Sequence, residues 1–283
     1  MIRELARAKV NLDLLVTGRR ADGYHELDSL VAFADIGDEL ILEPSPELTL
    51  ELTGPFTAGL ATGPDNLVLC AAHRLAAAAG IRPGARLRLD KRLPVAAGLG
   101  GGSADAAAAL RGLRRLWDLP LDDRRLAALG LELGADVPVC LAGHTARMRG
   151  IGERVEPVPG LAPLHLLLVN PGLPLTTAAV FRELAGAAIG PRREPWPARP
   201  DAAWLARSRN DLEAPARALA PLVGEVLAQL AAAPDCGLAR MSGSGTTCFG
   251  LFVGQEAQRA AAEAIARARP LWWVAACRAG DPA

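Results

Sequence analysis

The chain has 283 residues, of which 51% are hydrophobic, 22% charged and 4% aromatic, and its formal net charge at pH 7 is zero. This length is long for one domain but suits two, so we expect a soluble two-domain protein. A neutral chain lacks the basic field by which nucleic-acid-binding proteins collect phosphates, and few aromatic residues are present to stack on bases. We therefore expect a small-molecule ligand and no nucleic-acid partner.

The cysteines and the apolar runs set further limits. Five cysteines are widely spaced, form no CxxC pair and are odd in number, so neither a zinc knuckle nor a disulfide framework is indicated. No apolar run approaches the roughly 18 residues that span a bilayer. The start, Met1–Glu4, mixes charges instead of leading into a signal-peptide core. We expect a cytoplasmic protein with no membrane partner.

Alternating apolar and polar residues predict strands in the first third of the chain. The alternation covers residues 10–14 and 48–53, with a turn at Asp22-Gly23 between them. The same period of two recurs at Ala85–Asp90, where alanine and leucine alternate with arginine and aspartate. These segments predict half-buried strands.

Helix signals follow on both sides of the last of these strands. Asn66 is a favoured N-cap for a helix over Leu67–Ala79, which Gly80 closes. A later helix is predicted from about Asp122 to Leu133, followed by an irregular turn at 134–138. Short strands are expected around Val139 and Thr145, before a proline-containing stretch. We place a domain boundary there, which divides the chain into residues 1–156 and 157–283.

A glycine-rich loop at residues 94–105 joins the predicted strand Ala85–Asp90 to an alanine-rich helical pattern that runs toward Trp117. Ser103 is the expected N-cap of that helix. A helix N-terminus leaves four backbone N–H groups unpaired and carries a partial positive charge of about half a unit, so it suits a polyphosphate. Glycines let the backbone approach such a ligand closely. The loop therefore favours phosphate binding over the alternative of a flexible connector.

Two common phosphate-binding motifs do not fit this loop. The P-loop requires a lysine after its last glycine, but Gly102 is followed by Ser103. In a dinucleotide-binding fingerprint the third glycine would stand at position 103, where this chain has Ser103. In addition, no acidic residue about 20 positions on closes a clear βαβ unit. A different class of phosphate loop is needed.

The second half alternates strand and helix patterns in an order that approximates β-α-β-β-α-β, a split βαβ layout with a helical insertion. The predicted elements are a strand at 164–169, a helix at 177–185, helices between 210 and 233, strands at 238–241 and 248–253, a helix at 256–267 and a last strand at 271–277. Ser242-Gly243-Ser244-Gly245 lies between the two middle strands. Both halves of the chain are predicted to be α+β.

Taken together, several segments resemble the GHMP kinases over nearly the whole chain. The matching segments are Ala8–Leu12, Asp22–Leu27, Pro64–Leu67, the glycine-rich loop, Leu133–Pro138, Asn170–Gly172 and Met241–Gly245. The resemblance implies a two-domain α+β fold, with an N-terminal domain like domain 2 of ribosomal protein S5 and a ferredoxin-like C-terminal domain. Within the family, the Asp22–Leu27 and Leu133–Pro138 segments resemble a kinase of the non-mevalonate isoprenoid pathway. It phosphorylates the 2-hydroxyl of a cytidine diphosphate conjugate of methylerythritol.

The resemblance also implies the site residues and the cofactors, ATP and Mg²⁺. Asp136 would act as the base and Lys9 beside it would offset negative charge. The implied ATP-binding residues are Asn66, Pro94, Val95, Ala96, Ala97, Gly98, Leu99, Gly100, Gly101, Gly102, Ser103 and Ala104. The implied substrate-binding residues are Asn11, Tyr24, His25, Thr177 and Phe181. The metal ligands are not predicted, since Mg²⁺ is held mainly by phosphate oxygens and water.

Simpler interpretations compete at each of these positions. Asp136 could cap a turn through its carboxylate, and Lys9 could be a solvated strand residue. Tyr24 and His25 could pack beside the Asp22-Gly23 turn, and Phe181 could belong to a helix core.

The glycine-rich loop also departs from the family pattern. Ala96 replaces an expected glycine and is tolerated only if its φ is negative, and Ala104 replaces a frequent serine. The stretch 186–204 matches nothing in the family. A different GHMP kinase, or an inactive nucleotide-binding relative, remains an alternative function.

Overall fold

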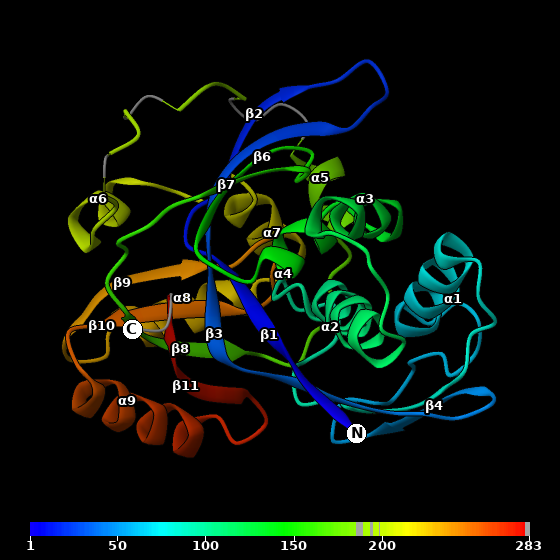
Figure 1. Ribbon diagram of the computed structural model, residues 1–283. Helices are drawn as coiled ribbons and strands as arrows, with labels where there is room; N and C mark the ends of the chain where they lie inside the picture. The colour runs from blue at the N-terminus through cyan, green and yellow to red at the C-terminus, as the bar shows by residue number, and fades with distance from the viewer. Residues whose placement is uncertain (185–188, 193–194, 198, 281–283) are drawn as a thin grey trace. The chain divides into compact units, whose positions relative to one another are not determined.

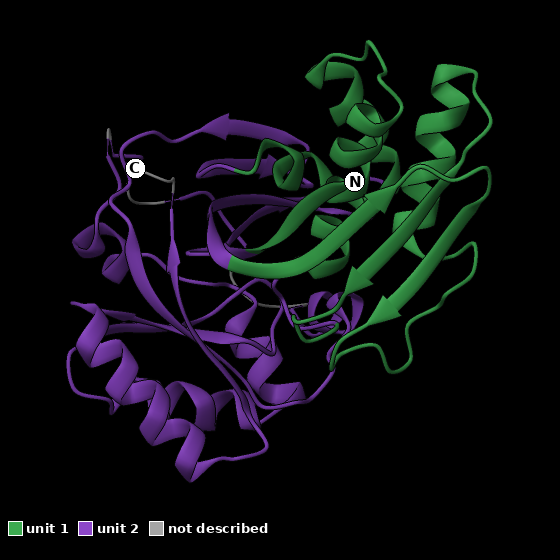
Figure 2. Cartoon of the chain, turned by 60° about the horizontal axis from the view of Figure 1, so that its bottom comes forward, with its two compact units in different colours: residues 1–8, 36–95, 100–143 green, residues 9–35, 96–99, 144–283 purple. Residues whose placement is uncertain are grey.

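The computed structural model describes residues 1–184, 189–192, 195–197 and 199–280 (Figure 1). These residues form two compact units, one of residues 1–8, 36–95 and 100–143, and the other of residues 9–35, 96–99 and the described part of 144–283 (Figure 2). We call them unit 1 and unit 2 and describe each by itself. Neither unit is a continuous half of the chain, so this grouping differs from a division at 156/157, which stays a prediction.

Unit 1 contains a small sheet built on an alternating strand. Strand β5 (Ala85–Asp90) pairs in parallel with β4 (Leu48–Thr53) and antiparallel with residues 39–43 of β3 (His25–Glu43). The apolar residues of β5 are buried, whereas Arg86 and Arg88 are exposed, as the period of two predicts. The predicted strands at 48–53 and 85–90 are confirmed.

The helices of unit 1 are α1 (Leu67–Ala79), α2 (Gly101–Leu116), α3 (Asp123–Leu133) and α4 (Val137–Ala142), and α2 packs against the other three. The Asn66 side chain caps α1 by accepting from the Val68 N–H, and Gly80 ends that helix in the left-handed conformation, with φ at +66°. The predicted boundaries of α1 and α3 are therefore confirmed.

Two local predictions in unit 1 are wrong. The N-cap of α2 is Gly100, with φ at +64°, instead of Ser103, because only a residue without a side chain enters the helix easily from that left-handed conformation. Val137 to Val139 belong to α4 instead of a turn and a strand. Pro138 is compatible with this because a proline in the first helical turn has no intrahelical hydrogen bond to lose.

The C-terminal part of unit 2 is an antiparallel sheet with the order β11-β8-β10-β9. Its strands are β8 (Leu164–Asn170), β9 (Cys236–Met241), β10 (Cys248–Phe252) and β11 (Trp273–Ala279). Helices α8 (Leu222–Ala231) and α9 (Gln255–Ala268) pack on it and share one apolar core. When the four strands are numbered by their order in the chain, they lie side by side in the sheet as 4-1-3-2. This is the order of a ferredoxin-like split βαβ fold, so that prediction is confirmed.

The rest of unit 2 surrounds the first half of β3. Strand β2 (Leu15–Arg19) and strand β6 (Ala146–Gly150) pair with it antiparallel, β1 (Ile2–Asn11) also pairs with β3, and β7 (Arg154–Pro157) extends β6.

Three short helices complete unit 2, namely α5 (Thr177–Glu183), α6 (Ala202–Arg207) and α7 (Glu213–Leu219). The predicted end of the helix at residue 185 lies outside the described residues. Among the helices that the structure describes, none is both long and apolar enough to cross a membrane.

Ala96 provides a test of the loop backbone. Its φ is +52°, so the condition under which alanine would be tolerated is not met. A left-handed non-glycine residue costs about 1–2 kcal/mol, which exceeds the entropy of about 0.4–1 kcal/mol that a glycine adds to the unfolded chain. Since Ala96 is exposed, no packing is lost. We expect Ala96→Gly to raise the free energy of unfolding, measured in urea, by about 0.5–1 kcal/mol.

The matched control is Ala97→Gly. Ala97 is buried, with 4% of its surface exposed, and is not among the described residues with positive φ. This change should lower the free energy of unfolding. If both variants lost stability, the strain at Ala96 would be excluded.

Candidate functional site

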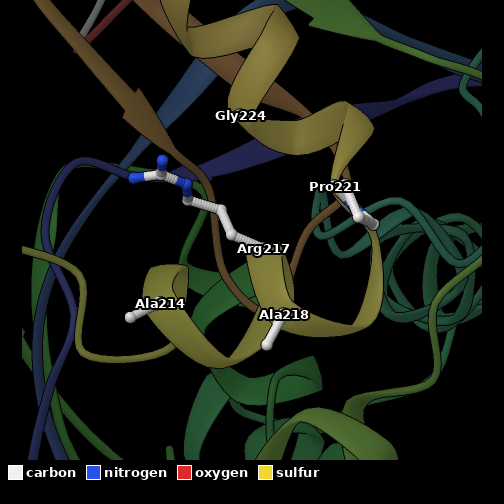
Figure 3. A pocket seen from close by; sticks show the side chains of 5 residues that line it. All are labelled: Ala214, Arg217, Ala218, Pro221 and Gly224. Atoms are coloured by element: carbon white, nitrogen blue, oxygen red, sulfur yellow. The ribbon is translucent and has the colours of Figure 1, made fainter.

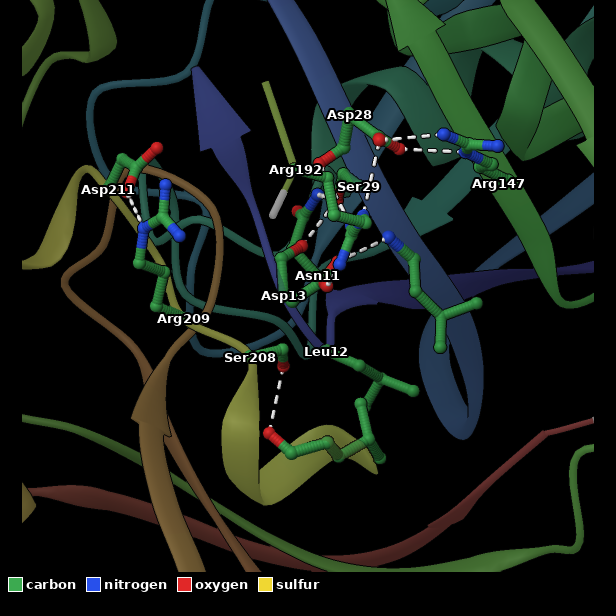
Figure 4. Close-up of polar contacts among 12 residues, drawn as sticks. Asn11, Leu12, Asp13, Asp28, Ser29, Arg147, Arg192, Ser208, Arg209 and Asp211 are labelled. Atoms are coloured by element: carbon green, nitrogen blue, oxygen red, sulfur yellow. Dashed lines mark hydrogen bonds and ion pairs between the residues drawn. The ribbon is translucent and has the colours of Figure 1, made fainter. Parts of the chain in front are cut away.

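A buried lysine lies at the end of β1 in unit 2. Lys9 and Asn11 are two residues apart, so they share one face of the strand, and their exposed fractions are 3% and 1%. The Lys9 Nζ donates to Asn11 Oδ1 at 3.2 Å. Asn11 Nδ2 donates to Ser29 Oγ at 2.8 Å (Figure 4). The interpretation of Lys9 as a solvated strand residue is therefore wrong.

Residues 96–99 of the glycine-rich loop are held by hydrogen bonds inside unit 2. The Lys9 N–H donates to the Leu99 carbonyl at 2.9 Å, and the Thr247 N–H donates to the Ala97 carbonyl at 3.1 Å. Ser242 Oγ donates to the Gly98 carbonyl at 2.9 Å and accepts from the Asn11 N–H at 3.1 Å. The predicted Lys9, Asn11 and part of the loop thus come together on one hydrogen-bonded framework.

Glycine is required where the loop meets the Ser242–Gly245 turn. A Cβ at Gly98 would lie 2.3 Å from the Ser242 carbonyl oxygen, and one at Gly243 would lie 2.9 Å from the Gly98 carbonyl oxygen. Asn210 fixes this turn, because its Nδ2 donates to the Met241 and Gly243 carbonyls, each at 2.8 Å. Sequence reasoning missed Asn210, since an asparagine at the start of the predicted helices between 210 and 233 gives no signal of a contact with a distant turn.

The remaining part of the loop belongs to unit 1, where it enters α2. The first turn of this helix presents backbone N–H groups that have no intrahelical partner, as a phosphate site requires. Asn66 has a structural role, since its side chain caps α1 and donates to the Ala61 carbonyl at 2.8 Å. Its predicted contact with ATP stays a prediction.

Asp136, also in unit 1, stands at the N-terminus of α4. It is partly buried, and its carboxylate makes no capping hydrogen bond to that helix. Capping of α4 therefore does not explain the presence of an aspartate at this position.

The aromatic residues predicted to bind substrate lie in unit 2. The rings of His25 and Phe181 are stacked, with centroids 4.8 Å apart and planes 17° from parallel, and Tyr24 is 61% exposed. Burial and the nearby Arg19 lower the pKa of His25, so its ring is neutral near pH 7. Phe181 also packs against the apolar core, which bears out part of the simpler interpretation. Thr177 Oγ1 is hydrogen-bonded to Ser244 Oγ at 2.8 Å.

The other lysine of the chain forms a buried triad in unit 1. Lys91 Nζ donates to Asp38 Oδ2 at 2.5 Å and to Asp105 Oδ2 at 2.7 Å. Burial raises the pKa of Asp105 to about 7, although Lys91 opposes this, and the pKa of Lys91 is raised by the two carboxylates against the effect of burial. Asp105 belongs to the second turn of α2, so its bond to Lys91 ties the start of this helix to the end of β5.

No cluster of three or more His, Cys, Asp or Glu side chains among the described residues could hold a metal ion. Mg²⁺ commonly keeps several waters and takes only one or two carboxylates beside phosphate oxygens. The described residues therefore fit a Mg²⁺ that is carried by a nucleotide better than one in a protein cage.

A pocket of about 380 Å³ lies by α7 and α8 in unit 2 (Figure 3), and Ala214, Arg217, Ala218, Pro221 and Gly224 line it. Its lining has one cation and no acid, nucleophile or aromatic ring, and none of the predicted site residues belongs to it. It does not compete as a catalytic site.

Comparisons with known families and proteins agree with the fold. Residues 66–144 match the GHMP kinases N terminal domain, and residues 198–270 match the GHMP kinases C terminal domain. A relative from Cereibacter sphaeroides is 54% identical over 98% of this chain and 99% of its own length, and one from Paracoccus denitrificans is 55% identical over 97% and 95%. Both are named 4-diphosphocytidyl-2-C-methyl-D-erythritol kinase.

Solved structures give the same picture. A crystal structure of 4-(cytidine 5'-diphospho)-2C-methyl-D-erythritol kinase has a TM-score of 0.81 and 40% identity, covering 99% of this chain and 100% of that one. A homoserine kinase from Cytophaga hutchinsonii has a TM-score of 0.73 at 19% identity, covering 98% of this chain and 95% of that one, and shows the shared fold alone.

The Asp105 carboxyl predicts a pH dependence of stability. Its pKa is raised in the folded state, so between about pH 4 and pH 7 the folded protein binds more protons than the unfolded chain and the Asp105 contribution to stability falls as pH rises. Asparagine does not titrate, so Asp105→Asn does not lose this contribution. The free energy of unfolding of the variant minus that of the unchanged protein should therefore rise over this range, by at most about 1.4 kcal/mol per pH unit.

Urea unfolding at pH 5, 6, 7 and 8 measures this difference. Asp123→Asn is the control, because the Asp123 side chain is 93% exposed. A difference for Asp105→Asn that stayed constant from pH 5 to 8 would exclude the raised pKa.

Proposed function

The chain belongs to the GHMP kinase family, and we propose that it transfers the γ-phosphoryl group of ATP to the 2-hydroxyl of 4-diphosphocytidyl-2-C-methyl-D-erythritol. This is a step in the formation of isoprenoid precursors by the non-mevalonate route. The observation that carries the substrate is the 54% identity to kinases named for it, over nearly the full length of both chains. The fold alone does not choose a substrate, since homoserine and mevalonate kinases share it.

The proposed chemistry assigns separate tasks to Asp136 and Lys9. The attacking hydroxyl must lose its proton as the new P–O bond forms, and we propose that the Asp136 carboxylate accepts it. The Lys9 ammonium would offset the negative charge that develops on the transferred group. Its burial supports this role, because a charge in a site that excludes water acts more strongly than one in solvent.

ATP would lie with its phosphates at the glycine-rich loop. The N–H groups in the first turn of α2 would donate to the phosphate oxygens, and the loop of residues 94–104 would surround them. Mg²⁺ would arrive with ATP, held by phosphate oxygens and water, and when bound it neutralises charge on the phosphates.

The cytidine part of the substrate would be recognised by aromatic residues. The stacked His25 and Phe181 and the exposed Tyr24 support this proposal, because a pyrimidine ring gains about 1–3 kcal/mol by stacking. A neutral His25 ring can donate to or accept from the edge of the base. Asn11 and Thr177 would contact the remainder of the substrate.

A cytoplasmic location without nucleic-acid or membrane partners is part of the proposal. The cysteines at positions 70, 140, 236, 248 and 277 form no disulfide with one another, which is compatible with a reducing compartment.

Asp136→Asn tests the proposed base. We expect kcat for ADP release with Mg-ATP and the cytidine substrate to fall by about 100- to 10,000-fold, because the hydroxyl proton loses its acceptor. ATP binding measured by calorimetry should be unchanged. The control is Asp123→Asn, on the exposed face of α3, which should keep full activity. Turnover close to normal in Asp136→Asn would remove this residue from the mechanism.

Phe181→Leu tests the recognition of cytidine. Leucine keeps apolar packing against the core but removes the ring, so we expect KM for the cytidine substrate to rise about 5- to 150-fold with KM for ATP unchanged. Phe181→Tyr keeps the ring and should stay near normal. Homoserine and mevalonate, assayed beside the cytidine substrate, should give no ADP, and turnover of either would favour another GHMP kinase activity.

A further inference from the structure

Two carboxylates and two guanidinium groups form a buried cluster beside Lys9 and Asn11 in unit 2. Arg192 Nη1 donates to Asp13 Oδ2 at 2.7 Å, and its Nε donates to Asp28 Oδ2 at 3.2 Å (Figure 4). Arg147 donates to both oxygens of Asp28 at 2.8 and 2.7 Å. The side chains of Asp13 and Arg192 are 0% and 7% exposed. The cluster carries two positive and two negative charges and is therefore balanced.

Asp13 depends on Arg192 more than Asp28 does. Asp28 keeps a bidentate arginine partner without Arg192, whereas the hydrogen bonds of the Asp13 carboxylate are to Arg192 and to the Leu30 N–H, at 2.7 Å. Burial raises the pKa of Asp13, and the hydrogen bond and charge of Arg192 are the largest effects that oppose it. Loss of Arg192 would leave a buried carboxylate without its main counter-charge.

Asp13 is joined to Lys9 by a short chain of hydrogen bonds. Ser29 Oγ donates to the Asp13 carbonyl at 2.5 Å and accepts from Asn11 Nδ2 at 2.8 Å. Asn11 Oδ1 then accepts from the Lys9 Nζ at 3.2 Å. One hydrogen bond of the ammonium group is therefore linked, through Asn11 and Ser29, to the backbone of Asp13.

Arg192 comes from a stretch in which the sequence indicated no function. The described residues around it, 189–192 and 195–197, form no helix or strand. The guanidinium carbon of Arg192 lies 5.0 Å from the ring centroids of both Trp196 and Trp204, and these two rings pack edge to face at 5.3 Å. Carboxylates on one side and indole rings around it therefore fix the guanidinium group.

We propose that Arg192 is a positioning residue for the phosphoryl transfer, which holds Lys9 in its working place through Asp13, Ser29 and Asn11. The inference rests on the proposed function for the role of Lys9. Arg192 does not touch the substrate in this proposal, and the contacts of its guanidinium group that carry the argument are those to Asp13 and Asp28.

The kinetic test compares Arg192→Met with Arg192→Lys. A displacement of about 1 Å in a catalytic group costs on the order of 100-fold in rate. We therefore expect kcat of Arg192→Met, per ATP-binding site counted by calorimetry, to fall between about 10- and 100-fold, with little change in KM for ATP. Arg192→Lys, which keeps the charge without the planar fork, should recover part of the rate. The control is Arg209→Met, since Arg209 forms an exposed ion pair with Asp211 and should leave kcat unchanged.

A second measurement does not require turnover. The sequence contains only two lysines, Lys9 and Lys91, so a protein labelled with ¹³C at the lysine ε carbons gives two assignable NMR signals. In Arg192→Met the Lys9 signal should shift, while the signal of Lys91, whose partners lie in unit 1, should stay in place. Arg192→Gln, which retains a hydrogen-bond donor, is the variant to use if Arg192→Met does not fold.

The outcomes separate the two proposals. If the unchanged protein releases no ADP with the cytidine substrate, the proposed function fails, but a shift of the Lys9 signal would still support the coupling. If the protein is active and the Lys9 signal and kcat of the folded Arg192 variants match those of Arg209→Met, the positioning role of Arg192 is overturned.

Discussion

A buried ammonium group is the constraint on which the arrangement of unit 2 depends. Lys9 is 3% exposed, and a charge in the protein interior is costly unless hydrogen bonds and opposite charges compensate it. Asn11 accepts from it directly, Ser29 orients Asn11, and the balanced cluster around Asp13 holds Ser29. Apolar side chains at most of these positions would stabilise the core as well as the buried polar groups do. The polar groups are therefore better explained by the need to place a cation precisely.

The same strand explains the form of the glycine-rich loop. Lys9 and Asn11 bind the loop and the Ser242–Gly245 turn through backbone hydrogen bonds, so the loop is part of the framework that carries the lysine. Glycines in such a loop are usually attributed to the approach of a phosphate. At Gly98, however, a side chain would collide with the Ser242 carbonyl of the protein itself. This glycine is required by the contact between two loops before any ligand binds.

Regular elements with a strong local pattern could be predicted from the sequence. Strand β5 and helix α1 were found with their ends, because alternation and caps are properties of neighbouring residues. The prediction of Ser103 as the cap of α2 is wrong, because the chain enters this helix through a left-handed Gly100 and neighbouring residues do not reveal that backbone conformation. Within the site, Lys9 and Asn11 were recognised through their resemblance to a family, while Asn210 and Arg192 gave no signal. Asn210 binds the Met241 and Gly243 carbonyls, which lie 31 and 33 residues further along the chain, and no local pattern records such a contact.

By itself the sequence determined most of the element types, the split βαβ order of the second half and the family, because these follow from periodicity and from motifs in a fixed order. The tertiary structure alone decided that Lys9 is buried and that its ammonium group donates to Asn11. Arg192 stands 179 residues from Asp13 and 164 from Asp28. The partner of a buried charge depends on where the folded chain brings an opposite charge, and the pattern around either residue does not contain that information.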